Sequence, residues 1–334
     1  MDLDDIQGIV LHGYRSLPFA SYHLLGFGAG QPRQLLARLV SEISSCAEPR
    51  AEHRLQLALT ASGLRALGLP LDALAQFSRE FRQGMAHPER AAALGDSADE
   101  APEAWELGGP KTEALDGLCM TFASTREGLA LLGESQARLC ERFGVSLRTY
   151  EAEPLAAPRP ASSSASVARK TPRKERVPLG ELVLGERDVL GERQRGPFVP
   201  VKYGTRPMPD WVRRERALDF GQNGSYLVLR KLSRVAAAEP GTETQRAAVH
   251  DSQALGSEDS RPHHLWRRSR ALADGLWFMA LNANIRRQFE YVQQGRCHEP
   301  GWAADESRQL RLRGGAYFFL PGIRALNYLA EPGA

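Results

Sequence analysis

The sequence predicts an α+β fold in which helices cover one side of an antiparallel sheet. Short segments in which apolar residues alternate or run together are separated by longer segments in which apolar residues recur at helical spacing. The composition, with 42% hydrophobic and 25% charged residues, is typical of globular proteins. A chain of 334 residues is long enough for two domains that each bury a core.

The first half, residues 1–150, is expected to form one such domain. Runs of strand length cover residues 6–14, 19–27, 55–59 and 115–123. Helical spacing covers residues 35–43, 60–67, 71–81 and 126–143. Pro32 stands where the first helix can begin, and the segment 68–70 (GLP) separates the second helix from the third.

Residues 151–178 are rich in Pro, Ser and basic side chains and contain almost no large apolar residues, so we expect a linker or mobile loop. Six Lys and Arg residues lie between positions 159 and 176 with no aromatic residue among them. Nucleic-acid surfaces of the stacking type need aromatic side chains, so no nucleic-acid partner is expected. A solvated loop is favoured here over a site for a polyanion.

The remainder, residues 179–334, is expected to form the second domain. Strand-like segments cover residues 181–184, 225–232, 276–282 and 316–320. Helical segments cover residues 285–292 and 323–330, and residues 236–262 are polar enough to form a second long loop.

Charge and cysteine usage restrict the class of protein. The net charge is +3, but residues 1–150 carry 14 basic and 19 acidic side chains and the rest carry 29 and 21. The four cysteines lie far apart without a CxxC pair, which argues against a zinc ribbon or a disulfide-rich secreted fold. The acidic start does not resemble a signal peptide, and no apolar stretch is long enough to span a membrane. We therefore expect a cytoplasmic protein without a membrane partner.

Several stretches of the chain, in order, resemble the dye-decolorising (DyP-type) haem peroxidase family. They are residues 5–11 (DIQGIVL), 57–64 (LALTASGL), 81–85 (FRQGM) with 94–96 (LGD), 223–228 (NGSYLV), 281–290 (LNANIRRQFE) and 314–322 (GGAYFFLPG). The resemblance implies two ferredoxin-like halves, each an antiparallel sheet with peripheral helices, and a haem b site in the second half. It also implies one-electron oxidation of dyes or phenolic compounds, with hydrogen peroxide and a small aromatic reductant as partners. A homo-oligomer is left open.

Arg267 is the residue with the clearest implied role. Residues 265–270 (LWRRSR) resemble the family stretch LLRRGR, although Ser269 replaces its glycine. The first arginine of that stretch assists peroxide cleavage beside the haem, so Arg267 is the candidate catalytic and cofactor-binding residue. A fixed, forked cation suits this task. The alternative interpretation is that Arg267 and Arg268 pair with carboxylates at a domain surface.

His250 is the candidate iron ligand, because the family places its proximal histidine upstream of the double arginine. The residues after His250 are not the expected basic ones, so His263 and His264 are kept as alternatives. A histidine in a polar loop is otherwise a solvated side chain.

The distal acid is the main departure from the family pattern. No GxxDG motif lies between the first half and residues 180–186 (GELVLGE), which resemble the family segment GEFxLGY, and Asp188 is a poor substitute. The sequence therefore indicates a haem peroxidase with weakened acid–base chemistry. The alternative is a degenerate relative that has lost haem and acts as a scaffold or interaction protein. Binding of a polyanion or membrane surface is the least favoured class, and the five tryptophans are expected to fill the core or an interface.

Overall fold

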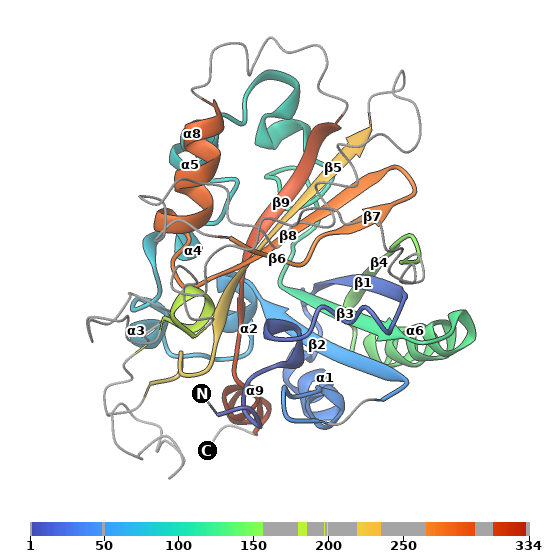
Figure 1. The fold of residues 1–334 in the computed structure, drawn as a ribbon. Coiled ribbons are helices and arrows are strands. Elements are labelled where there is room, and N and C mark those ends of the chain that lie inside the picture. Colours follow the sequence, from blue (N-terminus) through green and yellow to red (C-terminus); the bar gives the residue numbers. More distant parts are fainter. Residues whose placement is uncertain are drawn as a thin grey trace, which may run out of the picture.

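In the described part of the chain, nine strands form one antiparallel sheet in the computed structural model (Figure 1). The structure describes residues 2–48, 51–155, 180–185, 197, 199, 219–234, 265–297 and 310–331. The strand order is β4-β1-β3-β2-β9-β5-β8-β6, and β7 also pairs with β8. The predicted α+β class with antiparallel pairing and peripheral helices is confirmed.

The amino-terminal half contributes four strands in the order 4-1-3-2, the arrangement of a ferredoxin-like unit. These strands are β1 (Phe19–Gly26), β2 (His53–Leu59), β3 (Gly117–Ala123) and β4 (Ser146–Glu151). The α-helices of this half are α1 (Pro32–Leu39), α2 (Ala61–Ala66), α3 (Leu71–Leu74), α4 (Arg79–Gln83), α5 (Pro88–Leu94) and α6 (Arg126–Arg142).

The helix starts follow local capping rules. Thr60 accepts a hydrogen bond from the Gly63 amide at the start of α2, and Thr125 accepts one from the Gly128 amide at the start of α6. Pro32 occupies the first position of α1, as predicted. The helix expected over residues 71–81 is instead two helices, α3 and α4. Ser78 caps the start of α4 by accepting a hydrogen bond from the Phe81 amide.

The carboxy-terminal half repeats the 4-1-3-2 order as β9-β5-β8-β6. Its strands are β5 (Ser225–Arg234), β6 (Trp266–Arg267), β7 (Arg270–Leu272), β8 (Gly275–Asn282) and β9 (Leu310–Leu320). A π-helical turn, η9 (Arg286–Glu290), leads into α8 (Tyr291–Cys297), and α9 (Ile323–Ala330) follows β9. The strand expected at residues 181–184 is wrong, because Gly180–Leu184 forms a second π-helical turn, η6.

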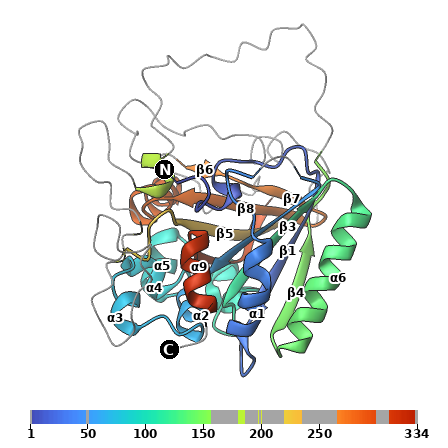
Figure 2. The same ribbon diagram turned by 90° about the horizontal axis from the view of Figure 1, so that it is seen from below.

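The two halves meet in the middle of the strand order, and a second time near its ends. Strand β2 joins β9 through the pair Leu59 and Phe319, and an isolated antiparallel bridge joins Ala152, just after β4, to Leu272 of β7. The sheet therefore curls until the residue that follows its first strand, β4, reaches β7, which shares β8 with the last strand, β6. Figure 2 shows α6 lying alongside β4 and β1, on the outside of this curled sheet.

Two hydrophobic clusters lie on the two faces of the sheet. The inner core draws on strands of both halves and, within the described residues, on no α-helix; its largest members include Tyr22, Phe122 and Trp277. The outer core lies between the sheet and the helices and includes Phe81, Phe289 and Tyr317. Most side chains of β1, β3, β5 and β8 are consequently buried from both faces.

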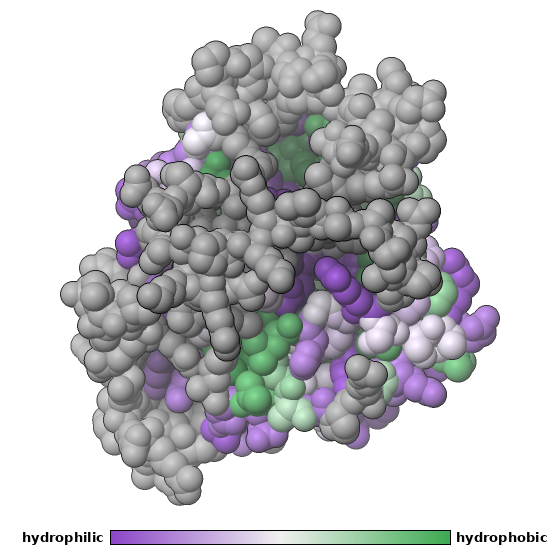
Figure 3. Space-filling model, in the orientation of Figure 1, coloured by the Kyte–Doolittle hydropathy of each residue, from purple (hydrophilic) through white to green (hydrophobic). Residues whose placement is uncertain are grey.

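Helices in the described part of the chain are too short or too polar to cross a lipid bilayer. On the face seen in Figure 3, the described residues are mainly hydrophilic, with hydrophobic residues gathered near the lower centre. Trp105 and Trp277 are buried and Trp266 packs against the inner core, as expected for core residues, whereas Trp211 and Trp302 lie outside the described residues.

Candidate functional site

Arg267 lies on the outer face of the sheet. It belongs to β6, where it stands opposite Ala280 of β8. Side chains of directly opposed residues in antiparallel strands point to the same face, and Ala280 belongs to the outer core. The Arg267 side chain is partly buried there. The structure thus keeps the candidate catalytic arginine on the helix-bearing face of the carboxy-terminal half.

Arg268 serves a different purpose on the opposite face. Its Nε donates to the Ile9 carbonyl at 2.8 Å and its Nη2 donates to the Val10 carbonyl at 2.9 Å. The guanidinium also stacks 4.8 Å from the Trp266 ring centroid. Burial lowers the pKa of Arg268 to about 10, which leaves it charged at neutral pH. Arg268 therefore binds backbone carbonyls. The alternative interpretation, in which Arg268 pairs with a carboxylate at a domain surface, is wrong.

Arg270 also turns toward the amino-terminal residues. It donates to the carbonyls of Tyr14 and Leu17 at 3.4 Å and of Pro18 at 3.3 Å, and it lies over the Phe122 ring. Two of the three arginines in residues 265–270 are therefore structural, and only Arg267 extends onto the outer face.

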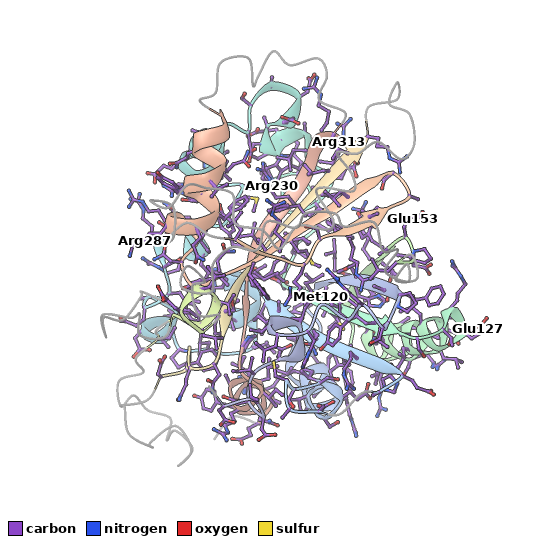
Figure 4. All side chains as sticks on the ribbon, viewed as in Figure 1. Met120, Glu127, Glu153, Arg230, Arg287 and Arg313 are labelled. Atoms are coloured by element: carbon purple, nitrogen blue, oxygen red, sulfur yellow. The ribbon has the colours of Figure 1, made fainter. Side chains whose placement is uncertain are left out.

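A buried ionic network occupies the outer face beneath α5. Arg90 of α5 pairs with Glu290 at 2.9 Å and approaches Glu80 at 3.8 Å. Arg230 of β5 pairs closely with Asp96, which follows α5. Figure 4 shows Arg230 among the strands of the carboxy-terminal half. The Arg90–Glu290 pair and the Arg230–Asp96 pair each join a residue of the first half to a residue of the second.

The π-helical turn explains how a carboxylate enters this core. In an α-helix, residue 290 would lie about 140° around the axis from Ile285. The Glu290 amide instead donates to the Ile285 carbonyl five residues back, which brings both side chains to the buried face. Arg287 of the same turn stays exposed at the periphery (Figure 4).

Burial controls the protonation of this carboxylate. Glu290 is completely buried, and desolvation raises its pKa, while hydrogen bonds from Tyr317 and Arg90 oppose the shift. The Tyr317 hydroxyl donates to Glu290 Oε1 at 2.9 Å. Burial and the nearby Glu290 charge also raise the pKa of Tyr317.

The candidate iron ligands lie elsewhere in the chain. His250, His263 and His264 are outside the described residues, and so is Asp188. From residue 180 onward, the described residues contain no histidine. They supply a cation, Arg267, in the half where the resemblance puts haem, but no imidazole that could ligate iron. The haem assignment therefore depends on these three histidines.

The buried histidine that the structure does describe belongs to the first half. His23 of β1 is only 1% exposed; its Nδ1 lies 2.8 Å from Thr149 Oγ1 and its Nε2 lies 2.9 Å from Ser21 Oγ. Burial lowers its pKa to about 4, so it is neutral at pH 7. With both ring nitrogens engaged, His23 is a structural residue.

The sequence matches no protein-family profile and no curated protein. An ancestral D-type dye decolorizing peroxidase superimposes with a TM-score of 0.62 and 15% identity, covering 99% of this chain and 100% of that one. A DyP-type peroxidase of Anabaena sp. gives 0.59 and 16%, covering 98% of this chain and 94% of that one. A decolorizing peroxidase of Auricularia auricula-judae gives 0.57 and 15%, covering 99% of this chain and 100% of that one. The chain therefore has the fold of the dye-decolorising peroxidases.

The ionic network could not be seen in the sequence. Glu290 falls in a stretch that resembles the family and that was predicted as a helix, and in an α-helix Glu290 would lie far around the axis from Ile285. Arg90 and Glu290 are 200 residues apart, so no spacing connects them. One signal was present in the sequence: Glu290 lies between Phe289 and the pair Tyr291 and Val292, which places a carboxylate within an apolar stretch.

Proposed function

We propose that this chain is a haem-dependent peroxidase of the dye-decolorising type, which uses hydrogen peroxide to oxidise dyes or phenolic compounds in one-electron steps. The observation that carries the proposal is the position of Arg267 on the outer face of the carboxy-terminal half, in a chain with this fold along nearly its whole length. His250 would ligate the iron, with His263 and His264 as the alternatives.

Haem, when bound, would supply an iron that accepts peroxide and takes single electrons from the reductant. The task of Arg267 is electrostatic. Its guanidinium cannot lose its proton in the working pH range and offers several donors in one plane. A partly buried cation stabilises negative charge on a departing oxygen more strongly than the same cation in water.

The acid–base step is proposed to be weak. The GxxDG motif that would supply an acid is missing from the sequence, and Asp188 has little of its context. Loss of a proton shuttle costs on the order of a hundredfold in rate. We therefore propose a slow enzyme that relies on Arg267 and the iron for peroxide cleavage.

The visible absorption spectrum tests the proposal. The protein would be produced with haem supplied, and its Soret band recorded for the wild type and for His250→Ala, His263→Ala and His264→Ala. The proposal expects a Soret band in the wild type that one of these variants loses, His250→Ala first. A colourless wild type that also refuses added haemin would refute it.

A haem-free scaffold is the second candidate, and one observation favours it. The described outer face of the second half holds no imidazole, and its buried cation Arg230 already has a carboxylate partner in Asp96. Such a core needs no cofactor to neutralise its charges. This candidate expects the same melting temperature with and without haem supply, whereas tight haem binding would raise it.

A reducing cytoplasmic location is part of the proposal. Cys46, Cys119 and Cys140 are buried and unpaired with one another, and burial raises the pKa of each thiol. Buried thiols of this kind are inert and need no oxidising compartment. A homo-oligomer is left for a light-scattering measurement to decide.

A further inference from the structure

The strand that carries Arg267 has little support of its own. Strand β6 is two residues long, and within the described part of the chain it ends the strand order, paired with β8 alone. Beyond this pairing, the Arg268 amide donates to the Met279 carbonyl at 2.8 Å. Short edge strands fray readily, so a second support is needed to fix an arginine there.

That support comes from the amino-terminal segment, which we define as residues 2–17. The Val10 carbonyl accepts hydrogen bonds from Trp266 Nε1 and from Arg268 Nη2, both at 2.9 Å. The Ile9 carbonyl accepts from Arg268 Nε at 2.8 Å. Two side chains that flank Arg267 in sequence are thus held by two consecutive carbonyls that are more than 250 residues away in the chain.

The amino-terminal segment is itself firmly held. Gln7 is fully buried, and its Nε2 donates to the carbonyls of Leu57 and Pro321 at 2.8 and 2.9 Å. The Ile9 amide donates to Gln56 Oε1 at 2.8 Å, and Ile9 and Val10 are each 1% exposed. The amino-terminal segment is therefore bonded to β2, to the end of β9 and to β6, and it fixes the position of β6 relative to the other two strands.

Arg268 is well suited to hold this joint. Its planar fork reaches both carbonyls at once, and its partly buried charge is stabilised by carbonyl dipoles and by the face of Trp266. Arg268 directly follows β6, and its side chain turns to the amino-terminal segment while Arg267 lies on the outer face, so a displacement of one residue displaces the other.

We propose that Arg268, held by the Ile9 and Val10 carbonyls, is the positioning residue that fixes Arg267 on the outer face. The residues 5–11 and 265–270, which the sequence presents as separate stretches, are one structural unit. The inference rests on the proposed function for its kinetic consequence, but its structural consequence is independent of haem.

The kinetic test measures the second-order rate constant for reaction of the haem-loaded protein with hydrogen peroxide. Arg268→Gln is expected to lower it at least tenfold at unchanged Soret intensity, and Arg268→Lys is expected to restore it only in part, because an ammonium lacks the fork. In the Arg267→Ala background, Arg268→Gln is expected to have almost no further effect. Equal factors in both backgrounds would overturn the inference.

Arg148→Gln is the matched control. Arg148 also donates to a backbone carbonyl, that of Glu106 at 2.9 Å, and stacks over an aromatic ring, that of Tyr150 at 5.1 Å. It lies on β4, which pairs with β1 and not with β6. This variant should keep the rate constant of the wild type.

Amide hydrogen exchange tests the inference in protein without haem. Arg268→Gln is expected to lower the protection of the backbone amide of residue 268, relative to its intrinsic exchange rate, at least tenfold, while Arg148→Gln leaves it unchanged. If the protein binds no haem, the proposed function fails, yet the exchange experiment still decides the positioning role. Unchanged exchange in Arg268→Gln would overturn it.

Discussion

The Tyr317 hydroxyl donates to the completely buried carboxylate of Glu290 at 2.9 Å, and the other oxygen of that carboxylate pairs with Arg90 of α5 at the same distance. A helix of the first half is in this way tied to the interior of the second. Paired charges in such a place contribute little net stability, but the removal of one partner leaves the other charge buried and uncompensated.

Glu290→Gln should therefore destabilise the protein strongly. The amide can still accept from Tyr317, but it cannot neutralise Arg90, for which Glu80 at 3.8 Å is a weaker partner. We expect the free energy of unfolding to fall by about 3–5 kcal/mol in urea titrations at pH 7. The control is Arg138→Gln, which removes an exposed pair with Glu134 and should cost no more than about 0.5 kcal/mol. Equal midpoints for the two variants would show that the network is not an energetic unit.

His23 should make the protein less stable in acid. Its pKa is about 4 in the folded protein and about 6.5 in an unfolded chain, so between these values only the unfolded chain binds the proton. Stability from this residue is complete above pH 6.5 and is lost as the pH falls to 4, with a total near 3 kcal/mol.

The measurement is the free energy of unfolding of His23→Gln and of the wild type at pH 7, 5.5 and 4. The difference between the two proteins should shrink steadily toward pH 4. His53→Gln, at an exposed position, should follow the wild type throughout. A pH-independent difference for His23→Gln would mean that the buried imidazole is not kept neutral.

Two helical glycines should respond to alanine in opposite directions. In α2, a Cβ on Gly63 would collide with the backbone oxygen of Asp116, which directly precedes β3 and is held by hydrogen bonds to the backbone of Leu25 and Thr60. In α6, a Cβ on Gly133 would meet only the His23 ring, at 3.9 Å. Gly63→Ala should cost about 1–3 kcal/mol or more, and Gly133→Ala should gain about 0.5–1 kcal/mol from helix propensity. Thermal unfolding of both variants checks this, and stabilisation by Gly63→Ala would contradict the close approach of α2 to the sheet.

Much of the fold could be predicted because its central elements carry strong patterns. Strand β8 is an almost continuous apolar run and β5 contains one at residues 226–229, and α6 and α9 have clear caps or one apolar face. Strands β6 and β7 could not be predicted, since two or three residues are too few for any periodicity. Strand β4 was missed because it is an edge strand with mostly exposed polar side chains. The prediction of a strand at residues 181–184 was wrong because Gly180–Leu184 contains too few apolar residues to distinguish strand periodicity from helical periodicity.

The candidate site was predictable only where resemblance applied. Arg267 was identified from its neighbours in sequence, whereas the different task of Arg268 depends on carbonyls more than 250 residues away. The inward turn of Glu290 depends on a π-helical hydrogen bond that no residue pattern indicates. The first feature depends on pairing between distant residues, and the second depends on a local irregularity of the helix that propensity does not reveal.

Peroxide-dependent bleaching of an anthraquinone dye by the haem-loaded protein tests the central claim most directly. The rate would be compared with that of free haemin at the same concentration and with that of Arg267→Ala. The account predicts that the protein exceeds free haemin and that Arg267→Ala loses on the order of a hundredfold in rate, as expected for removal of a group that stabilises developing negative charge. Bleaching no faster than by free haemin, or a rate unaffected by Arg267→Ala, would contradict it.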